Sequence, residues 1–110
     1  MSHYDCPCME RCPLHYAMNI IGGKWKIQIL CAVSNAGVIR YNALCAKLDG
    51  VSNTVLSSAL KELEEDGLIL RQAYPEVPIR VEYSPTDSCR TLLPILEQLS
   101  DWAEARMVQS

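Results

Sequence analysis

The apolar positions in the first third of the chain recur at helical spacing in two stretches. The first begins at Pro13, which suits the first position of a helix because it lacks an N–H that would be unpaired there, and it ends at Gly22-Gly23. The second starts at Lys24 and continues until residues 35–37 break the repeat. These patterns predict two helices, followed by room for only a short strand in the stretch VIRY.

Two further stretches predict a helix-turn-helix over residues 41–66. Tyr41, Leu44 and Leu48 share one face of a short helix, and the sequence DG after them indicates a turn. Ser52 is a good N-cap for the next helix, which ends at Gly67. The apolar face expected for this helix consists of Val55, Leu56, Ala59, Leu60 and Leu63.

The spacing then changes to the period of two that is typical of strands. LILRQAY and IRVEYS are rich in residues that favour strands, and PEVP between them predicts the loop of a hairpin. We expect this hairpin, residues 68–84, to form the wing of a winged helix-turn-helix.

The last apolar repeat predicts a helix over residues 86–108 that is capped by Thr86. Its apolar band is too broad for a helix that covers a small domain and has water behind it, so we interpret the surplus as a dimer contact. Pro94 should kink this helix or divide it into two pieces. The band consists of Leu92, Leu93, Leu96, Leu99, Trp102, Ala103 and Met107.

Length and composition complete the expected fold. A chain of 110 residues, 49% apolar and 21% charged, is typical of one globular domain. We predict an α+β fold that is mainly α: a winged helix-turn-helix spanning residues 1–110, with a β-hairpin wing, terminal dimerisation helices and a cysteine-rich arm over residues 1–12. No apolar run is long enough to span a membrane and the start is not a signal peptide, so we expect a cytoplasmic protein with reduced thiols and no membrane partner.

The distribution of charge favours a protein that binds an anionic partner, and the few histidines and missing catalytic motifs argue against an enzyme. The net charge is −3, but residues 20–61 carry five lysines and arginines against Asp49 alone, a local charge of +4. One face of the fold is therefore expected to be basic, although these charges could also be solvated helix faces. His3 and His15 are the only histidines, and the chain has neither a Ser-His-Asp order nor a glycine-rich phosphate loop. We predict that the protein is not an enzyme and needs no cofactor.

Three segments carry a resemblance to a known family. CPLHYAMNIIGGKWKIQIL, GVSNTVLSSALKELEEDGLILR and YPEVPIRVEYSPT together resemble the HxlR family of winged-helix bacterial transcription regulators, relatives of the MarR group. The resemblance implies a homodimer that binds an inverted-repeat DNA operator, and in several members a cysteine that responds to electrophiles, quinones or oxidants. The chain departs from the family pattern at Tyr41, Ile79, Pro85 and Cys89, where Phe, Pro, Leu and Gly are common.

Candidate DNA-binding residues lie on the polar side of the second helix of the helix-turn-helix. Asn53 and Thr54 are plausible base readers, because an Asn amide can bind adenine with two hydrogen bonds and a Thr methyl can contact thymine. Ser57 and Lys61 are better suited to phosphates. The whole set is Ser52, Asn53, Thr54, Ser57, Ser58 and Lys61, which would otherwise be ordinary solvated side chains.

Further basic residues extend the predicted interface. Arg80 in the hairpin is the candidate wing contact, to a minor groove or to phosphate, unless it pairs with Glu76 or Glu82. Flanking backbone contacts are expected from Lys24, Lys26 and Arg40, for which an ordinary surface position is the alternative.

The opening stretch CPCMERCP predicts a chemical sensor. By resemblance Cys12 is the reactive cysteine of the family, and its place before Pro13 at a helix N-terminus, beside Arg11, favours the thiolate. The sensing reaction at Cys12 would be alkylation, sulfenic acid formation or a disulfide, and for a disulfide Cys6, Cys8 or Cys45 of the partner subunit could serve as the resolving thiol. Such a bond could move the two recognition helices relative to each other.

Other interpretations of the cysteines stay open. A metal-responsive regulator could bind a metal ion through the N-terminal cysteines with His3 or His15, but C-x-C-x₃-C is not the C-x₂-C spacing that suits zinc, and we predict no metal site. The thiols of the arm could also be incidental. Cys31 and Cys89 are expected to be buried and structural, whereas Cys45 could be either structural or reactive.

The predicted function is that of a DNA-binding transcription regulator whose affinity follows cysteine chemistry or an inducing compound. The alternative from another class is a winged helix that binds a protein and has no operator. Operator binding should weaken steeply with salt because phosphate contacts release counterions, and this separates the two hypotheses.

Overall fold

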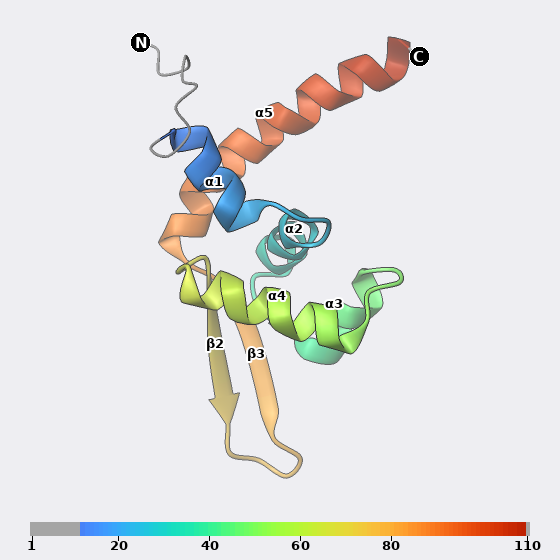
Figure 1. Ribbon diagram of the computed structural model, residues 1–110. Helices are drawn as coiled ribbons and strands as arrows, with labels where there is room; N and C mark the ends of the chain where they lie inside the picture. The colour runs from blue at the N-terminus through green and yellow to red at the C-terminus, as the bar shows by residue number, and fades with distance from the viewer. Residues whose placement is uncertain (1–11, 110) are drawn as a thin grey trace.

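The computed structural model of the chain describes residues 12–109, which form five helices and a small three-stranded sheet (Figure 1). This mainly helical winged-helix arrangement is the fold expected from the sequence. The elements follow in the order α1 (Pro13–Ile21), α2 (Lys26–Ala36), β1 (Ile39–Arg40), α3 (Tyr41–Lys47), α4 (Asn53–Glu65), β2 (Ile69–Tyr74), β3 (Arg80–Pro85) and α5 (Asp87–Gln109).

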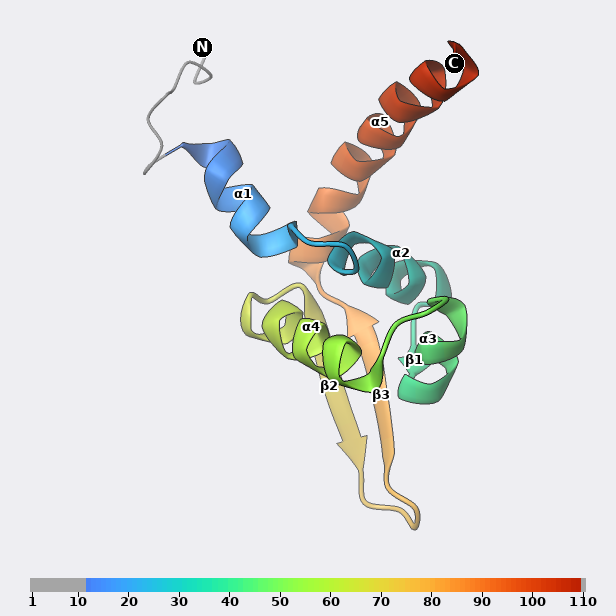
Figure 2. The ribbon, with the colours of Figure 1, turned by 45° about the vertical axis from the view of Figure 1, so that its right-hand side comes forward.

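The sheet is antiparallel and has the order β1-β3-β2. Strands β2 and β3 form the predicted hairpin, in register from Ile69 opposite Pro85 to Tyr74 opposite Arg80, with residues 75–79 as its loop. The two-residue strand β1 adds to the other edge of β3, where Ile39 faces Tyr83. The tip of the β2–β3 hairpin extends beyond β1 and projects away from the helices as a wing (Figures 1 and 2).

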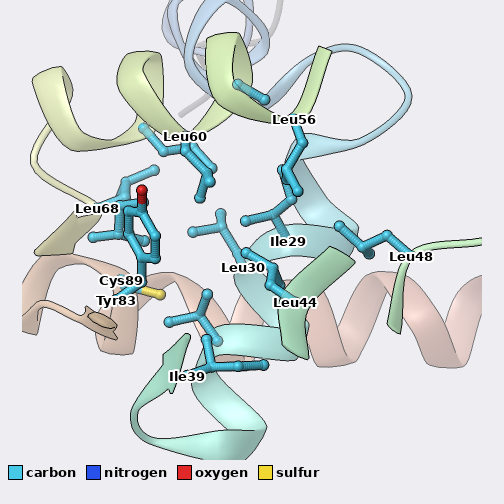
Figure 3. Close-up of a cluster of buried hydrophobic side chains, with 14 residues drawn as sticks. Ile29, Leu30, Ile39, Leu44, Leu48, Leu56, Leu60, Leu68, Tyr83 and Cys89 are labelled. Atoms are coloured by element: carbon cyan, nitrogen blue, oxygen red, sulfur yellow. The ribbon is translucent and has the colours of Figure 1, made fainter. Parts of the chain in front are cut away.

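The core lies between α2, α3, α4 and the base of the wing. Ile29, Leu30, Leu44 and Leu56 are fully buried and point toward one another (Figure 3). Burying each such side chain stabilises the fold by about 1.5–3 kcal/mol, so this cluster fixes α4 on the domain. The polar side of α4 is left facing outward as a consequence.

Helix α4 begins and ends where the sequence predicts, but one residue of its expected apolar face is wrongly placed. The Ser52 hydroxyl accepts a hydrogen bond from the Val55 amide at 3.1 Å, and Gly67 follows the helix at a φ of 79°. Leu56, Ala59, Leu60 and Leu63 are buried. Val55 is 44% exposed, because about 100° per residue places it at the edge of this buried stripe and not at its centre.

Helix α5 is anchored at its start and projects at its end. The Thr86 hydroxyl donates to the Gly67 carbonyl at 2.6 Å and accepts from the Cys89 amide at 3.2 Å, as expected for its cap. The helix continues through Pro94 as one element, so of the two expected effects of this proline, a kink or a division into two pieces, the division does not occur, and the kink stays a prediction. Beyond Leu96 it extends away from the domain, on the side opposite the wing (Figures 1 and 2).

None of the helices within residues 12–109 has both the length and the apolarity that a bilayer crossing requires.

Candidate nucleic-acid interface

The predicted DNA-binding residues of α4 are all exposed. Ser52, Asn53 and Thr54 lie at its N-terminal end, and Ser57, Ser58 and Lys61 follow along the helix. Their exposure follows from the burial of the opposite face against α2 and the sheet. The structure divides them into groups that face different neighbours, which the sequence alone did not predict.

One group joins α4 to α3. The Tyr41 hydroxyl at the start of α3 donates to Asn53 Oδ1 at 3.1 Å and lies 3.3 Å from Ser57 Oγ. Cys45, half-buried on the same short helix, approaches Asn53 Oδ1 at 3.8 Å. We call Tyr41, Cys45, Asn53 and Ser57 the α3–α4 polar cluster. The contact of Tyr41 with the predicted base reader Asn53 was not expected from the sequence, in which Tyr41 is one of the apolar positions of its helix and a departure from the family pattern.

A second group lies beside strand β2. Ser57 and Lys61 line a hollow of about 380 Å³ together with Arg71 and Tyr83. Neither Lys61 nor Arg71 forms an ion pair within the described part of the chain, although Glu64 lines the same hollow. Both cations are therefore available to an anionic partner.

Arg71 was not among the residues predicted from the sequence. It stands opposite Tyr83 in the register of β2 and β3, and residues opposite each other in an antiparallel pair lie on the same face. Since Tyr83 is buried toward α4, this register was the signal that places Arg71 beside the helix.

A third group lies at the connection between α1 and α2. Ser58 and Lys24 line a hollow of about 240 Å³, and the Lys24 ammonium stands 5.0 Å from the centre of the Trp25 ring. Lys26, which the sequence analysis also considered for backbone contacts, pairs with Glu62 on α4 at 2.6 Å, and its side chain is only 12% exposed. Lys26 therefore links two helices of the core instead of projecting into solvent.

The wing holds Arg80 in a network of its own. Arg80 pairs with Glu76 at 2.9 Å and with Glu82 at 2.5 Å, and its guanidinium lies 3.8 Å from the centre of the Tyr74 ring. The hydrogen bond to Glu76 is the main cause that raises the pKa of Arg80 above its ordinary value. This is the pairing that the sequence analysis gave as the alternative to a DNA contact. The DNA contact itself stays a prediction.

A hollow of about 400 Å³ separates the wing from the start of α3. It is lined by Arg40, Tyr41, Asn42 and residues 76–81. Arg40, the predicted backbone contact, is exposed at this edge. Arg40 and Arg80 both line this hollow, and Arg80 is already paired with Glu76 and Glu82.

Cys12 stands where the sequence predicts, at the N-terminal end of α1. Its carbonyl accepts from the Tyr16 amide at 3.1 Å, and the residue is half-buried. Cys6, Cys8 and His3, on which the resolving thiols of the arm and the metal alternative depend, lie outside the described residues. Among residues 12–109 no three His, Cys, Asp or Glu side chains are grouped for a metal ion.

The prediction for Cys31 is wrong and the prediction for Cys89 is confirmed. Cys89 is fully buried, 3.5 Å from Ser34 Oγ. Cys31 is exposed because the buried stripe of α2 is Ile29, Leu30 and Val33, and about 100° per residue places Cys31 on the opposite side. Partial burial of its thiol, and secondly the nearby Cys89, nevertheless raise its pKa.

The chain is similar in sequence to known helix-turn-helix proteins. A family model described as HxlR-like helix-turn-helix matches residues 20–110. The HTH-type transcriptional regulator BH0655 of Halalkalibacterium halodurans is 48% identical over 90 residues, which cover 82% of this chain and 80% of the relative.

Solved structures agree with the family match. A MarR-family transcriptional regulator from Porphyromonas gingivalis W83 is similar with a TM-score of 0.81 and 38% identity, covering 87% of this chain and 93% of that one. The redox regulator HypR in its oxidized form is similar with a TM-score of 0.78 and 37% identity, covering 86% of this chain and 96% of its own.

Proposed function

The chain belongs to the HxlR-like helix-turn-helix family of transcriptional regulators, and from that premise we propose that it binds an inverted-repeat DNA operator as a homodimer. Regulators of this family are not enzymes. In our proposal residues 1–110 act as one domain, in which residues 41–66 read the DNA, residues 68–84 form the wing and residues 86–108 form the dimerisation helix. A regulator of chromosomal operators would act in the cytoplasm.

One observation supports operator binding above all. The exposed end of α4 carries small polar side chains, and Lys61 and Arg71, which form no ion pair within residues 12–109, flank it. The N-terminal part of a recognition helix enters the major groove, where small side chains permit close approach to base edges while flanking cations hold phosphates. The chain is acidic as a whole, so this local arrangement supports the function better than its net charge does.

Dimerisation is supported by the exposed apolar residues of the two terminal helices. Leu99 is 50% and Trp102 is 62% exposed on α5, and Leu14 and Met18 are exposed on α1. Exposed apolar area of this extent on one small domain marks a protein contact. An inverted repeat has twofold symmetry, and a homodimer provides it.

Thiol sensing through Cys12 is the finer part of the proposal. It is supported by the position of Cys12 at a helix N-terminus and by similarity to the redox regulator HypR. With a quinone as oxidant, Cys12 and a second thiol would form a disulfide, and the two electrons and two protons would reduce the quinone to a hydroquinone. Cys45 of the partner subunit, Cys6 and Cys8 are the candidate second thiols.

The test is binding of the protein to DNA from its own upstream region, followed by fluorescence anisotropy at several salt concentrations. Steep weakening with salt is expected for an operator, whereas a protein-interaction module would bind this DNA weakly or not at all. A quinone should change the affinity of the wild type but not of Cys12→Ser. Equal affinity in reductant, quinone and zinc would exclude both thiol sensing and metal sensing by the arm.

A further inference from the structure

The α3–α4 polar cluster constrains how the predicted base reader can form hydrogen bonds. The Tyr41 hydroxyl has one proton, and its acceptors on Asn53 are Oδ1 at 3.1 Å and the backbone carbonyl at 3.4 Å. Because that proton is directed to Asn53, the 3.3 Å contact with Ser57 must run the other way, with the Ser57 hydroxyl as donor. Protons therefore point from Ser57 to Tyr41 and from Tyr41 to Asn53.

Because the hydrogen bonds run from Ser57 to Tyr41 to Asn53, these two residues of α4 differ in the groups that they have left for a base. Asn53 Oδ1 has two lone pairs, and Tyr41 and Cys45 are placed to occupy both. The two N–H groups of the Asn53 amide have no partner within the described residues. The Ser57 hydroxyl donates its one proton to Tyr41, but its oxygen keeps lone pairs that can accept a hydrogen bond from a base. Asn53 is thus presented as a donor and Ser57, one helical turn later, as an acceptor.

Base edges in the major groove distinguish these two roles. Guanine presents two acceptors, O6 and N7, whereas adenine presents the N7 acceptor beside an N6 donor. An Asn that binds adenine with two hydrogen bonds needs its Oδ1 to accept from N6. In this structure that oxygen is already engaged, which disfavours the adenine contact expected from the sequence.

We propose that Tyr41 is a positioning residue that sets base specificity: it holds Asn53 as a donor that selects guanine over adenine, and Ser57 as an acceptor that selects a base with an exocyclic amino group. The inference rests on the proposed operator binding and deepens it. Tyr41 does not itself contact the base, so its effect is transmitted through the two α4 side chains that it orders.

The experiment selects bound duplexes from a random pool with the full-length protein in reductant, which keeps Cys45 as a thiol. The position read by residue 53 is identified as the one whose preference disappears in Asn53→Ala. There the wild type is expected to prefer guanine to adenine by about fivefold or more, the lower range for a good base contact. Tyr41→Phe removes the hydroxyl and should shift this ratio toward adenine by a similar factor.

Controls separate positioning from stability. Tyr16→Phe, which removes a hydroxyl from an exposed tyrosine on α1, should leave the base profile unchanged. In the double variant Tyr41→Phe with Asn53→Ala, the loss of the hydroxyl should have no further effect at that position. Thermal unfolding of Tyr41→Phe confirms that the variant is folded, and a ratio of two sequences bound by the same sample is insensitive to small losses of stability.

Three results would overturn the inference: an adenine preference in the wild type at this position, an unchanged base profile in Tyr41→Phe, or a loss of affinity that is equal on all sequences. Each of them leaves operator binding itself intact. A wild type that enriches no sequence from the pool would instead refute the proposed function, and this inference with it.

Discussion

Lys61 projects from α4 and Arg71 from the facing strand β2, and both line the hollow beside Ser57. Because phosphate contacts carry no sequence information, Lys61→Ala and Arg71→Ala should each weaken binding equally on all sequences and lower the salt slope by about 1. Asn53→Ala should instead remove the sequence preference at the base pair that Asn53 reads. Anisotropy titrations over a range of salt, on a selected and an unrelated duplex, distinguish these effects. Arg90→Ala, whose partner is Asp87 on α5, is the matched control and should change neither value.

The thiol of Cys31 provides a prediction about pH. Its raised pKa means that less thiolate is present at neutral pH than in an ordinary exposed cysteine. Alkylation of Cys31 by iodoacetamide should therefore be slow at neutral pH and should accelerate as the pH rises, with a midpoint above that of the same cysteine in the unfolded chain. Mass spectrometry of peptides from timed samples measures both rates, and equal rates in folded and unfolded chain at neutral pH would contradict the shift.

At the scale of elements, α4 depends on its first residue as well as on its buried face. The Ser52 hydroxyl satisfies the Val55 amide, which has no partner inside the helix. Ser52→Ala should lower the free energy of unfolding by about 1 kcal/mol, a typical value for the loss of an N-cap. Urea unfolding measures it, with Ser58→Ala as an exposed control on the same helix. Equal stability of the two variants would show that the cap contributes nothing measurable.

The elements also show where an apolar pattern is ambiguous. In α4 the apolar residues are separated by polar ones, and the buried face is predicted correctly apart from Val55. In α2 the run IQILCAV is apolar almost throughout, so its period does not fix which side faces the core. Cys31 was therefore expected to be buried, whereas packing against α4 and the sheet buries Ile29, Leu30 and Val33.

At the scale of the whole molecule, α5 is the element that the single chain leaves incompletely covered. The double substitution Leu99→Glu with Trp102→Glu should prevent two copies from burying this surface, because each new glutamate would place an unpaired charge in an apolar contact. Sedimentation velocity should then show a monomer at concentrations at which the wild type is a dimer, and operator affinity should fall. Leu70→Glu, at a leucine of similar exposure on β2, should remain dimeric. A variant at Leu99 and Trp102 that is still dimeric would place the interface elsewhere.

The sequence by itself determined the order and nearly all the bounds of the elements, the N-cap of α4, the hairpin and the surplus apolar surface of α5, because these depend on residues close together in the chain. The tertiary structure alone decided which side of α2 is buried, that Arg80 is paired within the wing, and that Arg71 stands beside Lys61. It also brought the Tyr41 hydroxyl to Asn53 across the turn between α3 and α4. The contacts of Arg71 and of Tyr41 join residues of different elements, so their distances follow from how the elements pack and not from any local spacing. The glutamates that pair with Arg80 are close to it in the chain, so the sequence offered this pairing, and the conformation of the wing decided between it and an unpaired side chain.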